Sequence, residues 1–155
     1  MEFNVSGLSP DPFHHLFGLT DAELRGFGAL RVVADRPRAY PDRVELRDAE
    51  PGEHLLLVNY THQPARNAYF ASHAIFVLEG ARRPYSRVGE IPPVMRSRQL
   101  SLRSFDASDM MLDAELAHGS RAEQSIARLL ADPLASYLQA HYATRGCYAA
   151  RIERA

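Results

Sequence analysis

Residues 54–60, HLLLVNY, and residues 74–78, AIFVL, carry apolar side chains on both faces of an extended chain. A strand that is covered on both sides has this pattern, so the two segments predict central, buried strands. Residues 99–105, QLSLRSF, alternate instead and place Leu100 and Leu102 on one face. That alternation predicts a strand with one buried face and one solvated face.

Further strands are predicted on both sides of these segments, over residues 30–35, 43–47, 110–116, 137–142 and 147–152. Turn-forming residues separate them, for example Arg145-Gly146 between the last two, whereas Ile91-Pro92-Pro93 predicts a loop. The strands dominate and do not alternate regularly with helices. We therefore expect an α+β fold with a mostly antiparallel sheet or open barrel and two short helices.

The two helices are predicted from capping boxes, in which a hydroxyl and a carboxylate three residues apart satisfy free backbone N–H groups. Thr20 and Glu23 form the first box, and Gly26 and Gly28 would end a helix of about two turns. The second box is Ser120-Arg121-Ala122-Glu123, and apolar residues at helical spacing follow it as far as Pro133. Both helices are therefore expected to be short.

The composition favours one ordinary globular domain over residues 1–155. The apolar and charged fractions are 46% and 24%, and the net charge is −1. Neither nucleic acid nor an anionic membrane is expected as a partner, because no overall field attracts them. Residues 1–7 lack the basic and apolar regions of a signal peptide, and no apolar run is long enough to cross a membrane. A cytoplasmic location is expected.

The basic residues exclude several enzyme classes. All 18 are arginines, and lysine is absent. Schiff-base enzymes, pyridoxal-phosphate enzymes and P-loop nucleotide hydrolases require a lysine ammonium group, which a permanently protonated guanidinium does not replace. We expect no cofactor.

The single cysteine, Cys147, cannot form an intrachain disulfide. If residues 137–142 and 147–152 form a hairpin, His141 and Cys147 lie near its facing ends. A histidine within hydrogen-bond reach of a thiol favours the nucleophilic thiolate, so His141 and Cys147 are candidate catalytic residues. The alternative is that Cys147 is a small buried apolar side chain.

A candidate ligand site comes from the polar segment between two predicted buried strands. It contains Tyr60 and His62, and such loops often carry function because a rigid scaffold positions their side chains. Arg43 and Arg103 fall on outward faces of predicted strands and could clamp a carboxylate or phosphate. The alternatives are a long hairpin loop and salt-bridged surface arginines.

No metal site is predicted, although the chain has seven histidines. No pair of histidines has the helical spacing of a zinc site, and there is no pair of cysteines. A site built from His62, His73, His141 and Cys147 would require all four to converge in space, which spacing does not determine.

The chain also resembles one bacterial family, catalogued as domain of unknown function 1203. The resemblance runs almost from end to end, and its more specific segments are Asp48-Ala49-Glu50-Pro51-Gly52-Glu53 and Asn59-Tyr60-Thr61-His62-Gln63-Pro64. Further similar segments are residues 30–35, 40–43, 74–77, 101–103 and 145–151. The resemblance implies a small single-domain bacterial protein without an assigned activity, cofactor or partner.

Three functions are compatible with these observations. The preferred hypothesis is a binding module for a small anionic ligand, held by Arg43, Tyr60, His62 and Arg103, with His141 beside them. The second is a hydrolase or transferase with Cys147 as nucleophile and His141 as base, in which an arginine stabilises an oxyanion. The third is a subunit of a larger assembly, such as a homo-oligomer.

Overall fold

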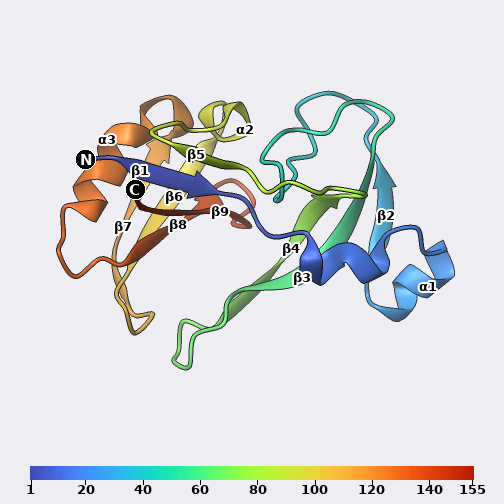
Figure 1. Ribbon diagram of the computed structural model, residues 1–155, viewed down its shortest axis with the longest axis horizontal. Coiled ribbons are helices and arrows are strands. Elements are labelled where there is room, and N and C mark those ends of the chain that lie inside the picture. Colours follow the sequence, from blue (N-terminus) through green and yellow to red (C-terminus); the bar gives the residue numbers. More distant parts are fainter.

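The computed structural model describes all residues 1–155 and contains two antiparallel sheets that lie next to each other along the long axis (Figure 1). The larger sheet has the strand order β5-β1-β9-β8-β6-β7 and the smaller sheet the order β2-β3-β4. The strands of the larger sheet are β1 (Phe3–Ser6), β5 (Ser86–Val88), β6 (Gln99–Phe105), β7 (Met111–His118), β8 (Tyr137–Tyr142) and β9 (Tyr148–Arg154). Those of the smaller sheet are β2 (Leu30–Val33), β3 (His54–Gln63) and β4 (Ala71–Leu78).

The helices are short. They are α1 (Asp21–Gly26), α2 (Pro93–Arg96) and α3 (Ala122–Leu130), with 3-10 helices over Asp11–Leu16 and Gly119–Arg121. The amphipathic helix α3 buries Ile126, Leu129 and Leu130, and it packs on β6, β7 and β8 of the larger sheet. None of the helices combines the length and the hydrophobicity that crossing a membrane requires.

Two separate hydrophobic clusters form the core, one for each sheet. Nineteen buried residues pack around the larger sheet and α3, and fourteen pack around the smaller sheet and α1. The chain runs from the larger half to the smaller one after β1 and returns between β4 and β5. The long connection between β2 and β3 contributes Leu46 to the first cluster and Val44 to the second. This connection therefore lies at the junction of the two halves.

The predicted α+β class is confirmed, since the strands form open antiparallel sheets with few helices. The first capping box is also present: Thr20 Oγ1 accepts from the N–H of Glu23, whose carboxylate accepts from the N–H of Thr20. The prediction of a second capping box is wrong. Helix α3 begins after Arg121 without a side-chain cap, because Ser120 belongs to a 3-10 turn that His118 caps.

The strand predicted over residues 43–47 is wrong as well. Asp42 turns the chain there, because its carboxylate accepts hydrogen bonds from the N–H groups of Val44 and Glu45. Leu46 has a φ of 50°, which ends the extended conformation. Two short strands, β1 and β5, and the helix α2 were not predicted. The polar loop between β3 and β4 is shorter than expected, since pairing extends to Gln63 and resumes at Ala71.

Candidate functional site

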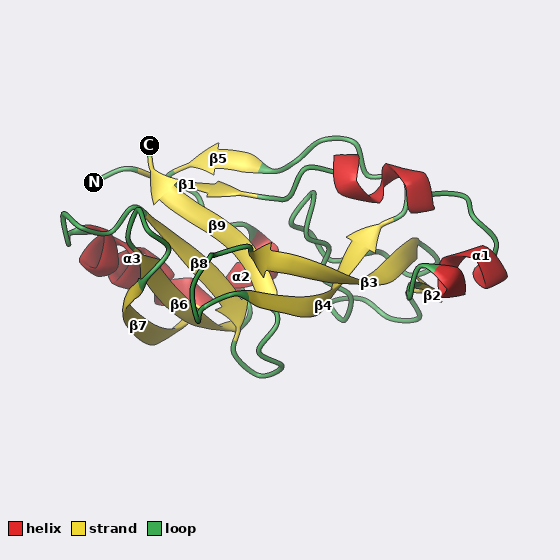
Figure 2. Cartoon of the chain, turned by 90° about the horizontal axis from the view of Figure 1, so that it is seen from below, coloured by secondary structure: helices red, strands yellow, loops and turns green.

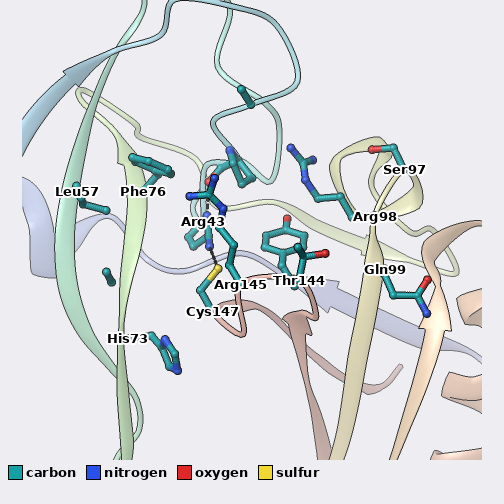
Figure 3. A pocket seen from close by; sticks show the side chains of 14 residues that line it. Arg43, Leu57, His73, Phe76, Ser97, Arg98, Gln99, Thr144, Arg145 and Cys147 are labelled. Atoms are coloured by element: carbon teal, nitrogen blue, oxygen red, sulfur yellow. Dashed lines mark hydrogen bonds between the residues drawn. The ribbon is translucent and has the colours of Figure 1, made fainter.

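A cavity of about 560 Å³ lies between the two halves of the molecule (Figure 3). Its wall on one side comes from β3 and β4, with Leu57 and Phe76. The opposite wall comes from the connection between α2 and β6 and from the turn between β8 and β9, and the β2–β3 connection supplies Arg43. The volume falls within the range of roughly 300–1,000 Å³ that small-molecule sites occupy.

The lining of this cavity is strongly cationic. It contains Arg43, Arg98 and Arg145 and no aspartate or glutamate. Asp48, which is not part of the lining, neutralises the charge of Arg98. The two terminal nitrogens of Arg98 donate to the Asp48 carboxylate over 2.8 and 3.2 Å. Arg145 is exposed in the β8–β9 turn, where Gly146 adopts a φ of 78° that permits the tight reversal. An anion entering the cavity would therefore meet two guanidinium groups that have no carboxylate partner.

Arg43 is unusual because its side chain is only 1% exposed and yet has no carboxylate partner. Its Nε donates to the carbonyl of Tyr148 over 2.7 Å, and Nη1 donates to the carbonyl of Pro41. Its guanidinium also lies 5.0 Å from the ring centroid of Tyr142. Burying a charge without a counter-charge is costly, so an anion beside Arg43 would recover part of that cost.

The thiol of Cys147 contacts Arg43, not His141. Arg43 Nη2 lies 3.0 Å from Cys147 Sγ, across 104 positions of sequence (Figure 3). A bulge between Ala140 and His141 shifts the β8–β9 register, so that Tyr142 is the residue whose N–H bonds to the carbonyl of Cys147. The expected hydrogen bond between a histidine and the thiol is thus replaced by a contact between guanidinium and thiol.

The hydroxyl of Tyr142 is a buried polar group without a partner. The residue is 5% exposed and lines the cavity, and no hydrogen bond reaches its hydroxyl oxygen. Burial raises the pKa of Tyr142 to about 12, so the hydroxyl keeps its proton. The guanidinium groups of Arg43 and Arg98 lie 5.0 and 5.4 Å from the centroid of its ring. A residue of the cavity lining therefore carries a buried donor that lacks an acceptor.

Three histidines do converge beside the cavity. Figure 2 shows that β3 and β4, which carry two of them, extend toward the larger sheet. The ring centroids of His62 and His141 are 5.0 Å apart, and those of His62 and His73 are 5.7 Å apart. Gln139 joins the two halves, since its Oε1 contacts His62 Nδ1 at 2.9 Å and its Nε2 donates to the carbonyl of His62. His62 also stacks on Tyr148. The main visible role of this cluster is to hold the two sheets together.

Both ring nitrogens of His141 face oxygen atoms, those of Gly146 at 3.2 Å and Gln139 at 3.3 Å. Burial, with the positive charge of Arg103 next, lowers the pKa of His141 to about 3, and burial also lowers the pKa of His62. Folded His141 is therefore neutral at every pH near neutrality. The assigned role of general base for Cys147 stays a prediction that these contacts do not favour.

The lowered pKa of His141 predicts a loss of stability in weak acid. As the pH falls below about 6.5, the unfolded chain binds a proton at His141 that the folded protein does not bind. The free energy of unfolding should therefore fall by about 1 kcal/mol between pH 6.5 and 5.5, and by much less between pH 7.5 and 6.5. Urea unfolding at pH 7.5, 6.5 and 5.5 measures this slope. The His141→Gln variant should show a shallower slope, and equal slopes would mean that His141 is protonated in the folded protein.

The other residues predicted to bind the anion do not line the cavity. Tyr60 packs against Phe13 with ring centroids 5.6 Å apart, and burial raises its pKa. Arg103 lies on the sheet face that carries His141, where its Nε donates to Ser101 Oγ and burial lowers its pKa. Arg103 and His62 belong to the adjoining polar layer, whereas Tyr60 packs against the hydrophobic cluster of the smaller sheet. Of the four predicted ligand-binding residues, Arg43 alone is in the wall.

Sequence reasoning missed Arg98, Arg145 and Tyr142 as cavity residues. Arg145 had a usable signal, because it belongs to the predicted Arg145-Gly146 turn, and turns at strand ends place side chains at the rims of sites. The sequence gives no such signal for Tyr142 and Arg98, since their neighbours in space come from distant segments. No group of three or more His, Cys, Asp or Glu side chains has the arrangement to hold a metal ion.

Comparison with known proteins gives a family and no activity. No curated protein and no solved structure matches the chain. A family model described as "Protein of unknown function (DUF1203)" matches residues 39–154. The match covers most of the chain, including both walls of the cavity and the Arg43–Cys147 contact. The chain therefore belongs to the DUF1203 family.

Proposed function

We propose that the protein binds a small organic anion in the cavity between its two sheets. The observation that carries this proposal is the buried guanidinium of Arg43, which borders a cavity lined by three arginines and no acidic residue. Arg43 uses three of its five N–H groups on Pro41, Cys147 and Tyr148, which leaves two for a ligand. Arginine donors of this kind suit the oxygens of a carboxylate or phosphate.

The apolar wall indicates what the rest of the ligand is. Leu57 and Phe76 face the arginines across the cavity (Figure 3). Binding sites for small molecules combine such apolar surface with a few polar groups that fix orientation. A flat or branched apolar group bearing one carboxylate or phosphate would fill both parts. Cytoplasm is the proposed location, since a single unpaired cysteine suits a reducing compartment.

Benzoate and phenyl phosphate are suitable probes, and benzamide is a control that keeps the ring but removes the charge. We expect both anions to bind, as measured by isothermal titration calorimetry and by NMR shifts, and benzamide to bind much more weakly. Arg145→Glu places a negative charge at the rim and should raise the Kd of the anions by about tenfold or more, which equals about 1.4 kcal/mol.

The matched control is Arg66→Glu, which makes the same change at an exposed arginine outside the cavity. It should leave the Kd within about twofold, because Arg66 does not line the cavity and solvent and salt screen exposed charges. Equal losses in both variants would show that the anions respond to net charge and not to this cavity. Equal binding of benzoate and benzamide would also contradict the proposal.

A further inference from the structure

We propose that Cys147 is a peroxide-reactive thiol, which Arg43 positions and activates and which a hydroperoxide oxidises to a sulfenic acid. This activity goes beyond anion binding and does not depend on it. It begins with the 3.0 Å contact between Arg43 Nη2 and Cys147 Sγ. The contact places a positively charged donor against the sulfur of a partly exposed thiol, which is the setting in which reactive cysteines are found.

A second observation is that polar groups in the lining of the cavity lack hydrogen-bond partners. Tyr142 lines the same cavity at 5% exposure, and its buried hydroxyl has no hydrogen-bond acceptor. Two N–H groups of Arg43 are also unused. A small molecule with two adjacent oxygens offers the acceptors that these donors lack. Cys147 itself is partly exposed, so such a molecule can reach it.

The groups around the thiol favour attack on a peroxide over acyl transfer. Acyl transfer requires a base and an acid near the nucleophile, for the leaving group and for the hydrolytic water. No histidine or carboxylate is hydrogen-bonded to Cys147 Sγ, because His141 faces Gly146 and Gln139. Attack on a peroxide needs no such base. Its leaving group is hydroxide or alkoxide, which guanidinium and phenol N–H and O–H groups stabilise directly.

The step balances with hydrogen peroxide as the oxidant. The thiolate sulfur attacks one peroxide oxygen, an S–O bond forms, and the O–O bond breaks. The oxygen bonded to sulfur keeps its hydrogen, which gives the sulfenic acid. The other oxygen leaves as hydroxide and combines with the proton that the thiol released on ionising, so the second product is water. Sulfur loses two electrons and the peroxide gains them.

The chain contains no second cysteine, so no internal thiol can reduce the sulfenic acid by forming a disulfide with Cys147. Reduction therefore requires two molecules of an external low-molecular-weight thiol. The first condenses with the sulfenic acid, releases water and leaves a mixed disulfide. The second attacks that disulfide and restores the Cys147 thiol.

The test compares the folded protein with a peptide of residues 144–150, which has the same neighbours in sequence but lacks Arg43. Both are treated with hydrogen peroxide, and sulfenic acid is trapped with dimedone and measured by mass spectrometry. We expect the folded protein to react at least roughly tenfold faster than the peptide. The protein unfolded in urea should react like the peptide, and Cys147→Ser should give no adduct.

Arg43→Gln should lose most of the rate advantage, whereas Arg43→Lys should keep part of it because the charge remains. Circular dichroism shows whether these variants fold, and the comparison of folded protein, unfolded protein and peptide decides the proposal if they do not. Equal rates in folded protein and peptide would overturn it. So would an undiminished rate in folded Arg43→Gln. Binding of benzoate to Cys147→Ser, measured separately, reports on the anion site alone.

Discussion

Replacing Gly7 with alanine should destabilise the protein by about 3 kcal/mol or more, because the new methyl group has no space. A Cβ built at Gly7 would lie 2.0 Å from the carbonyl oxygen of Val44 and 3.2 Å from that of Arg43. Both contacts are with backbone, which cannot rotate away as a side chain would. The N–H of Leu8 also donates to the carbonyl of Arg43 over 2.8 Å. The segment after β1 thus fixes the loop that carries Arg43.

Urea unfolding measures the loss, and Gly26→Ala is the control. Gly26 ends helix α1 and has open space around its Cβ position, so alanine there should be neutral or slightly stabilising. Folded Gly7→Ala protein should also bind benzoate more weakly, since displacing Val44 moves Arg43. If Gly7→Ala lowered the free energy of unfolding by less than about 1 kcal/mol, the segments that contain Gly7 and Val44 would be able to move apart at little cost.

Asp42→Ala should be comparably destabilising, again by about 3 kcal/mol, because it leaves buried N–H groups without acceptors. The carboxylate of fully buried Asp42 accepts from the N–H of Leu78 over 2.8 Å, of Glu45 over 2.5 Å and of Val44 over 3.2 Å. These bonds fold the β2–β3 connection against the end of β4. Burial raises the pKa of Asp42, and the three donors partly oppose that shift.

Chemical denaturation at pH 7.5 tests this prediction, with Asp11→Ala as the matched control. Asp11 is exposed and its carboxylate contacts only His14, at 3.7 Å, so its loss should change the free energy of unfolding by less than about 0.5 kcal/mol. Similar stabilities of the two variants would show that water reaches the three N–H groups when the carboxylate is removed.

Much of the fold follows from local patterns. Residues 99–105 and 137–142 form strands with the predicted limits. In residues 99–105 the alternation directly reflects which face is covered. β1 and β5 have four and three residues, too few for a period to be visible. The alternation of residues 43–47 was misleading, since the Asp42 carboxylate outweighs it by turning the backbone. Periodicity does not report such side-chain caps.

The site was less predictable than the fold. Arg43 and Cys147 were each recognised as candidates, but their contact joins two loops from opposite ends of the chain. The partner expected for the thiol, His141, was chosen from its place across a hairpin. The bulge at His141 alters that register, and no local signal marks the bulge. Side-chain partners depend on such single-residue shifts, to which strand patterns are insensitive.

The two hydrophobic clusters are separate, and the cavity lies at the junction between the two halves, which gives it a mechanical meaning. Separate clusters of this kind are expected to open as separate cooperative units, and the junction would then set how strongly one opening depends on the other. A molecule that touches both walls adds its binding energy to that junction and to neither core. By thermodynamic reciprocity, a ligand that binds both walls would couple the opening of the two halves, and a change that strengthens this coupling would tighten its binding.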